Sequence, residues 1–204
     1  MAIAAAPSAL LLDLLMAVMH SLETWGLAAG DERAGIAWRD AVTARMIAAE
    51  RYVPYERLVA DEARAAGLPA SAPDRLAEAW LQMRPWPDAA AVRRISVPYA
   101  VVTNCSARLA NEAASRSGLT PRFVLSAEEV GWYKPRREAY LQACALLGTV
   151  PGETLFVAGA AYDAIGAERA GLRSRLVLRR PAAAALPPGV TSTTDLAAAL
   201  AGVP

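Results

Sequence analysis

Short apolar runs alternate with helix-compatible segments through the second half of the chain, and this alternation constrains the fold more than any other feature. The predicted strands cover residues 98–103, 123–125, 154–158 and 174–178. The predicted helices cover residues 107–117, 136–147, 163–170 and 193–200, the first three of which are closed by Gly118, Gly148 and Gly171. Strands and helices in turn at this spacing indicate βαβ units, so the sequence predicts a parallel α/β sheet covered by helices on both faces.

The first apolar run of the chain contains an acidic residue. Residues 1–19 contain no basic residue, since the first one is Arg33, and Pro7 interrupts the run. Asp13 lies in the most apolar part, where an acid would cost roughly 2.5–3.5 kcal/mol at the centre of a membrane. These features argue against a signal peptide or a membrane anchor, so we expect a cytoplasmic protein without a membrane partner. We interpret residues 9–15 as a strand buried on both faces of the sheet.

Residues of about 18–87 give no strand signal and predict a helical insertion after the first strand. Helical spacing covers residues 36–49, 55–66 and 73–83, and Pro85 and Pro87 end this stretch. We therefore predict an α/β core of residues 1–17 and 88–204 and a helical cap of residues 18–87. The composition of residues 181–189 predicts a surface loop.

The scarcity of three residue types excludes much chemistry. Of the 21 basic residues 20 are arginine, so Lys134 is the one lysine; His20 is the one histidine, and the cysteines are Cys105 and Cys144. A three-histidine or four-cysteine zinc site is therefore impossible, and one cysteine pair does not indicate a disulfide framework. Lys134 stands in Tyr-Lys-Pro, not in a phosphate-binding loop. The net charge of +1 gives no broad field for nucleic acid.

Polar residues gather where the predicted strands end. Asp13 ends the first strand, Thr103 and Asn104 end the second, and Asp163 follows a later one, while Lys134 opens a helix in the same half. Ligands of open parallel sheets bind at the carboxyl ends of the strands, so this edge is the candidate site. A competing interpretation makes Thr103, Asn104 and Asp163 helix caps.

These motifs, in this order, resemble those of the haloacid dehalogenase superfamily. They read Leu-Leu-Asp13, Val-Val-Thr103-Asn104 and Tyr-Lys134-Pro135, followed by the segment that ends at Asp163. The resemblance implies a Rossmann-like core in which Asp13 is a nucleophile and Lys134 keeps it ionised in an apolar pocket. It implies no cofactor.

The insertion is most similar to that of the 2-haloacid dehalogenase branch. A cap follows the first strand there too, and Trp38-Arg39 resembles a cap Trp-Arg pair whose arginine receives the halide. Tyr140, six residues after Lys134, matches a tyrosine that lines that site. The resemblance and the apolar insertion also favour a homodimer.

The resemblance implies a metal-independent hydrolase that removes halide from a small 2-haloalkanoic acid through an aspartyl ester. Asp13 would attack the carbon, and Arg39 would receive the departing halide. Thr103 and Asn104 would bind the substrate carboxylate, and Asp163 would activate the water that hydrolyses the ester.

Two alternatives remain open. A phosphatase of the same superfamily would need Mg²⁺, but Leu15 and Ala160 stand where such enzymes carry acids. The second alternative is a catalytically weakened member of the superfamily that acts as a binding protein. It is suggested by Ala17, Ala158 and Ala160, which replace polar residues.

Overall fold

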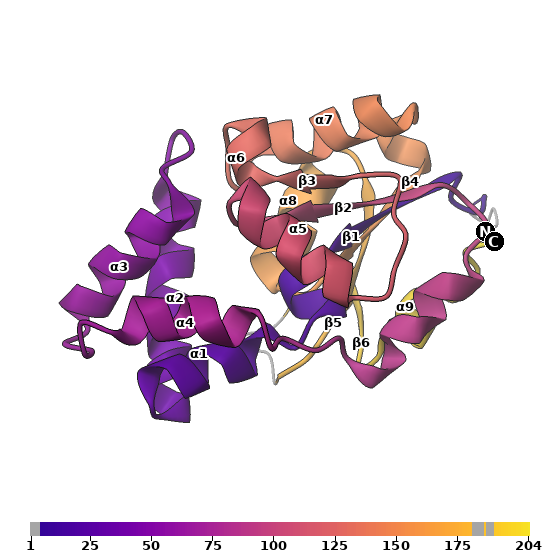
Figure 1. Cartoon of the computed structure of the whole chain (residues 1–204). Helices are drawn as coiled ribbons and strands as arrows, with labels where there is room; N and C mark the ends of the chain where they lie inside the picture. Colours follow the sequence, from indigo (N-terminus) through magenta and orange to yellow (C-terminus); the bar gives the residue numbers. More distant parts are fainter. Residues whose placement is uncertain (1–4, 181–185, 187–189) are drawn as a thin grey trace.

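The computed structural model describes residues 5–180, 186 and 190–204, and its centre is a six-stranded parallel sheet (Figure 1). The strands are β1 (Ala9–Asp13), β2 (Tyr99–Thr103), β3 (Val124–Ser126), β4 (Thr154–Ala158), β5 (Arg173–Val177) and β6 (Thr191–Thr193). Their spatial order is β3-β2-β1-β4-β5-β6, with parallel pairing throughout. The predicted parallel α/β fold is confirmed, and the strand order reverses beside β1, which makes its carboxyl end the natural place for a ligand.

The two faces of the sheet carry separate hydrophobic cores. Leu10 and Leu12 of β1 point into one core and Leu11 into the other, because successive strand residues face opposite ways. The first face is covered by η2 (Pro87–Arg94), α5 (Ala107–Arg116) and α9 (Leu196–Ala199). The second face is covered by α6 (Ala127–Val130), α7 (Arg137–Leu147) and α8 (Ala161–Arg169). A short turn of 3-10 helix, η3 (Pro151–Glu153), leads into β4.

Four helices lie together beyond the carboxyl end of the sheet (Figure 1). They are α1 (Ser21–Ala29), α2 (Glu32–Ala48), α3 (Tyr55–Ala65) and α4 (Ala72–Trp80), called the helical insertion below. The chain enters and leaves it through adjacent segments, since Met19 and Pro85 form an antiparallel bridge. The backbone N–H of His20 donates to the carbonyl of Arg84 at 2.8 Å beside this bridge.

Close backbone packing holds the first two helices of the insertion together. A Cβ atom added to Gly35 of α2 would stand 2.5 Å from backbone atoms of Trp25 and Gly26 in α1, so only glycine allows this approach. Trp38 packs edge-on against Trp25 at 4.8 Å, and its indole N–H donates to the carbonyl of Val59 at 3.0 Å. The buried residues of the insertion and those of the first face of the sheet belong to one continuous hydrophobic core.

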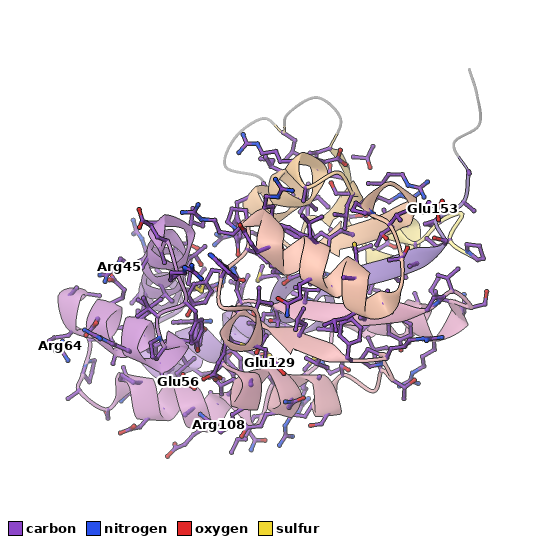
Figure 2. All side chains as sticks on the ribbon, turned by 90° about the horizontal axis from the view of Figure 1, so that it is seen from above. Arg45, Glu56, Arg64, Arg108, Glu129 and Glu153 are labelled. Atoms are coloured by element: carbon purple, nitrogen blue, oxygen red, sulfur yellow. The ribbon has the colours of Figure 1, made fainter. Side chains whose placement is uncertain are left out.

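Polar contacts fix the insertion across the end of the core. Glu56 at the start of α3 lies beside Arg108 of α5 (Figure 2), at 3.4 Å, and accepts a hydrogen bond from Ser106 at 2.7 Å. The hydroxyl of Tyr133 donates to the carbonyl of Val53 at 2.7 Å.

Several predicted elements differ at their ends from the observed ones, and two of these differences have a clear physical cause. The strand predicted over residues 9–15 ends at Asp13, because the chain turns there into a π-helix, η1 (Leu14–Val18). The helix predicted over residues 193–200 begins only at Leu196, because Thr191–Thr193 form β6 and Asp195 caps α9 by accepting from the Ala198 amide at 2.7 Å. Apart from residue 186, the loop predicted over residues 181–189 lies outside the described residues. Among the helices of the described ranges, none combines the length and the apolar character needed to span a membrane.

Candidate active site

The turn that follows β1 fixes the carboxylate of Asp13. Its Oδ2 accepts hydrogen bonds from the backbone amides of Met16 and Ala17, at 3.2 and 3.3 Å, and so caps the π-helix η1. Two side chains hold the outer side of this turn: the indole N–H of Trp86 donates to the Met16 carbonyl at 3.1 Å, and Arg179 donates to the Ala17 carbonyl at 2.6 Å. The acid is thus set in a fixed orientation by its own chain.

The ammonium of Lys134 lies between two carboxylates. Nζ donates to Oδ1 of Asp13 at 2.8 Å, to Oδ2 of Asp163 at 2.7 Å and to the carbonyl of Val102 at 2.9 Å. The side chain is 1% exposed, so these three acceptors replace its hydration. Asn104 holds the backbone of Lys134 in place by donating to its carbonyl at 2.9 Å and accepting from its N–H at 2.8 Å.

The second carboxylate, that of Asp163, is bonded at both oxygens. It lies in the first turn of α8 and is buried, with Lys134 at Oδ2 and the hydroxyl of Tyr140 donating to Oδ1. Tyr140 packs edge-on against Phe156, at 5.2 Å between ring centroids. Tyr140 therefore orients Asp163 from the interior of the protein.

Burial and charge shift the pKa values of this cluster. Burial acts to lower the pKa of Lys134, but the charges of Asp13 and then Asp163 outweigh burial and raise that pKa above its ordinary value. Burial raises the pKa of Asp163 to about 6, although the Lys134 charge opposes the shift. The lysine is thus charged at all working pH values, and Asp163 changes charge near neutrality.

A small cavity separates Asp13 from the helical insertion. Its volume is about 40 Å³, and one water needs roughly 10–15 Å³ by the same measure, so it has room for a few water molecules. The core side is lined by Asp13, Leu15, Met16, Asn104, Ala160 and Tyr162. The insertion side is lined by Ser21, Trp25, Arg39, Val42, Thr43, Met46 and Tyr55.

One face of α2 carries a basic group into this cavity. Arg39, Val42, Thr43 and Met46 follow one another at intervals of three or four residues, which places them on a single helix face. The side chain of Arg39 is 12% exposed, and its Nη1 donates to Asp40 at 2.9 Å. The site thus combines a carboxylate on one wall with a guanidinium on the other.

The structure brings three predicted residues to the cavity and leaves others away from it. Asp13, Arg39 and Asn104 line the cavity, and Lys134 lies directly behind Asp13. Thr103 is buried, with its hydroxyl 3.8 Å from the sulfur of Cys105, and is not among the lining residues.

Two of the predicted substrate-binding residues are not part of the cavity wall, and neither is the predicted base Asp163. Thr103 does not face the space where it was expected to bind substrate, because its side chain packs inside the core. Tyr140 does not line the site either, because its hydroxyl is turned to Asp163. The competing helix-cap interpretation is wrong as well: the N-cap positions are Ser106 for α5 and Ala160 for α8.

Sequence reasoning missed the three aromatic residues of the cavity wall, which are Trp25, Tyr55 and Tyr162. Tyr55 is the first residue of α3, and Tyr162 directly precedes Asp163 in α8. The position of Tyr162 beside a candidate base was a usable signal. Nothing in the helical pattern around Tyr55 distinguished it from an ordinary core residue.

The environments of the two cysteines and of the histidine indicate structural roles. Cys105 is buried without exposure, and burial raises the pKa of its thiol to about 12, which leaves it without a reactive thiolate. Cys144 is also free and buried. The ring of His20 packs against that of Trp86, at 3.8 Å between centroids and with the two planes tilted by 39°.

The donor set around Asp13 does not fit a magnesium ion. Both carboxylates of the cluster are bonded to the ammonium of Lys134, and Leu15 and Ala160 supply no oxygen ligand from their side chains. In the described part of the chain, no group of three or more histidine, cysteine, aspartate or glutamate side chains could hold a metal ion.

The fold thus places an acidic residue at the switch point of a parallel sheet, with a lysine bonded to it and a helical insertion beyond the same end of the sheet. A family model for haloacid dehalogenase-like hydrolases matches residues 10–171. The chain belongs to this family and is a hydrolase of its type.

Part of the chain is similar to a curated dehalogenase. A curated (S)-2-haloacid dehalogenase of Xanthobacter autotrophicus is 30% identical over 108 residues, which are 51% of this chain and 43% of that protein. The match thus spans less than half the length of the relative.

Solved structures show the same fold. A dehalogenase with an intermediate complex has a TM-score of 0.84 at 20% identity, with 97% of each chain covered. An L-2-haloacid dehalogenase from Xanthobacter autotrophicus, with chloropropionic acid covalently bound, has a TM-score of 0.73 at 19% identity and covers 86% of this chain and 79% of its own. At these identities the likeness concerns the fold.

Proposed function

We propose that this hydrolase removes halide from a small 2-haloalkanoic acid through an aspartyl ester, without a metal ion. The observation that carries the proposal is Lys134, buried between Asp13 and Asp163, with Asp13 facing a cavity that Arg39 also lines. The name of the curated relative, (S)-2-haloacid dehalogenase, supports the same reaction. In this proposal residues 18–87 act as the cap over the site.

In the first step, an oxygen of Asp13 attacks the carbon that bears the halogen. A carbon–oxygen bond forms as the carbon–halogen bond breaks, and the halide leaves with the bonding electron pair. The ammonium of Lys134, bonded to Asp13 at 2.8 Å, offsets the negative charge of the nucleophile inside the protein. Arg39 meets the negative charge that develops on the halide.

In the second step, water attacks the carboxyl carbon of Asp13 and the ester oxygen leaves with the 2-hydroxy acid. Asp163 accepts a proton of this water, for which a pKa of about 6 is suitable at neutral pH, and returns it to the departing ester oxygen, which becomes the hydroxyl of the 2-hydroxy acid. The second proton of the water leaves to solvent as the Asp13 carboxylate is restored. Lys134 at Oδ1 and the amides of Met16 and Ala17 at Oδ2 supply donors to both oxygens of Asp13 throughout the cycle.

The alternatives receive less support from the site. Phosphate-ester hydrolysis with Mg²⁺ lacks the oxygen ligands at Leu15 and Ala160, and the ammonium of Lys134 is bonded to both available carboxylates. A purely binding role would be favoured by a filled pocket, but Met16 lines the cavity without filling it.

The test is chloride release from (S)-2-chloropropionate in the presence of EDTA. Wild type should release chloride, Asp13→Asn should release none, and Asp163→Asn should accumulate an aspartyl ester that mass spectrometry locates on Asp13. Arg64→Met, at the outer edge of the insertion (Figure 2), is the matched control and should behave as wild type. Chloride release by Asp13→Asn at the wild-type rate would refute the mechanism.

A further inference from the structure

The outer side of the turn η1 is held by Trp86 and by a guanidinium that packs on it. The carbonyls in the last turn of a helix have no partner inside the helix, so they need donors from elsewhere. The Met16 carbonyl accepts from the indole N–H of Trp86 at 3.1 Å, the Ala17 carbonyl from Arg179 at 2.6 Å, and the Val18 carbonyl from the backbone N–H of Trp86 at 2.9 Å. The guanidinium of Arg179 lies over the Trp86 ring, 4.7 Å from its centroid. The position of Trp86 therefore affects the donors of three successive carbonyls.

One peptide group connects Trp86 to the nucleophile. The Met16 carbonyl and the Ala17 N–H belong to the same peptide unit, whose oxygen accepts from Trp86 while its N–H donates to Oδ2 of Asp13 at 3.3 Å. Hydrogen bonds in such a chain polarise one another, so a donor at the carbonyl strengthens the N–H as a donor on the other side. On the sheet side, a Cβ atom added to Gly159 would overlap Met16 and Ala17, so the turn has no room to move in that direction.

Trp86 also belongs to the segment by which the chain leaves the helical insertion. Its ring packs against His20, in the segment by which the chain enters the insertion. Two residues further on, Asp88 binds Arg179 through two hydrogen bonds of 2.8 and 2.9 Å. The leaving segment thus reaches the turn by two routes, directly through Trp86 and indirectly through Asp88 and Arg179.

We infer that Trp86 is a positioning residue for the nucleophile, because its indole N–H acts through the Met16–Ala17 peptide group on the hydrogen bond that Oδ2 of Asp13 accepts. The link also ties the nucleophile to the placement of the insertion. Only its effect on turnover rests on the proposed function. In that reaction negative charge returns to the carboxyl oxygens of Asp13 when water attacks the ester, so a weaker donor at Oδ2 should slow ester hydrolysis more than halide release.

The experiment observes this peptide group directly by NMR. Met-Ala pairs occur in the chain only at residues 1–2 and 16–17, so labelling the methionine carbonyl with ¹³C and alanine with ¹⁵N selects the Met16–Ala17 peptide group almost alone. Trp86→Phe keeps an aromatic ring and removes the N–H. In this variant the Met16 carbonyl carbon and the Ala17 amide proton should both shift upfield, and solvent exchange of the Ala17 amide should become about three- to tenfold faster.

A second variant and a matched control separate the lost hydrogen bond from lost packing. Benzothienylalanine at position 86 has the shape of tryptophan with sulfur in place of the N–H, and it should give the same shifts. Trp80→Phe is the control, because it also removes an indole N–H bonded to a backbone carbonyl at 3.1 Å, that of Leu109 in α5. It should leave the Met16 and Ala17 signals unchanged. Unchanged signals in both position-86 variants would overturn the inference, and so would equal shifts in Trp80→Phe.

Kinetics with (S)-2-chloropropionate distinguish this inference from the proposed reaction. If the wild type releases chloride, Trp86→Phe should lower kcat and KM together by about three- to tenfold, leave kcat/KM close to that of wild type, and accumulate the ester on Asp13. Shifted NMR signals with an unchanged kcat would overturn the positioning role. If the wild type releases no chloride, the proposed reaction is refuted, and the NMR shifts alone decide whether Trp86 acts on Asp13.

Discussion

Replacing Lys134 by methionine is the most direct test of the buried ion cluster. Methionine has nearly the same length and shape but no charge, so the change removes the ammonium and little packing. It leaves the carboxylates of Asp13 and Asp163 without the donor that now lies 2.8 and 2.7 Å from them, and the Val102 carbonyl without its donor at 2.9 Å.

The expected loss of stability is large because the cluster is buried. Breaking a buried ion pair by removing one partner costs about 3–5 kcal/mol, which is a substantial part of the roughly 5–15 kcal/mol of a typical domain. The loss also depends on pH. Burial already raises the pKa of Asp163 from 3.8 to about 6, and removing Lys134 should raise it further. Between about pH 4 and the raised pKa of Asp163, the folded variant would bind a proton that the unfolded chain has released, so its stability falls as pH rises through this range.

Urea unfolding at pH 5.5 and pH 8 measures both effects. The free energy of unfolding of Lys134→Met should lie below that of wild type at both pH values, and the deficit should be larger at pH 8. Arg64→Met is the control, because the Arg64 side chain is 78% exposed and its loss should change stability by about 0.5 kcal/mol or less. A deficit below about 1 kcal/mol that is equal at both pH values would refute a charged lysine between two carboxylates.

Three further predictions follow from other parts of the structure. Chloride release should decline as pH falls through about 6, because Asp163 then takes up the proton that it must accept from water, and a rate that stays constant from pH 7 to pH 5 would contradict this role. Asp88→Ala should lower the free energy of unfolding by about 2–4 kcal/mol, since it leaves the buried Arg179 without its two hydrogen bonds at 2.8 and 2.9 Å; chemical denaturation at pH 7 measures this. Gly35→Ala should cost about 1–3 kcal/mol in the same assay, because its Cβ would stand 2.5 Å from the backbone of Trp25 and force α1 and α2 apart; a change below about 0.3 kcal/mol would contradict the close packing.

The fold was predictable from the sequence where burial and periodicity agree. The strand over residues 154–158 matches β4 at both ends, because all five residues are buried in the middle of the sheet. The predicted strands are wrong where local polar groups determine the backbone conformation. Asp13 ends β1 because its side chain caps the turn after it, and β6 is a short edge strand of Thr-Ser-Thr that carries no apolar signal.

In the candidate site, the contacts between buried charged residues were predictable from the sequence. A buried acid needs a partner, and the chain has one lysine, so the contact of Lys134 with Asp13 follows from scarcity and burial. The direction of a side chain on its element does not follow in the same way. Thr103 and Asn104 are neighbours on one strand end, yet one packs into the core and the other reaches the cavity, because successive residues point to opposite sides.

The geometry of the cluster gives a physical reason for a lysine in a chain that otherwise uses arginine. An ammonium is compact and has three N–H donors pointing in tetrahedral directions, and here each meets an acceptor from a different element: Asp13 of β1, Val102 of β2 and Asp163 of α8. A guanidinium is planar and longer, and its fork suits two oxygens of a single carboxylate. Arg179 shows that second use, since it meets both oxygens of Asp88. Lysine and arginine are therefore not interchangeable here, and the requirement that one cation bind two carboxylates at the end of a parallel sheet selects lysine over arginine at position 134.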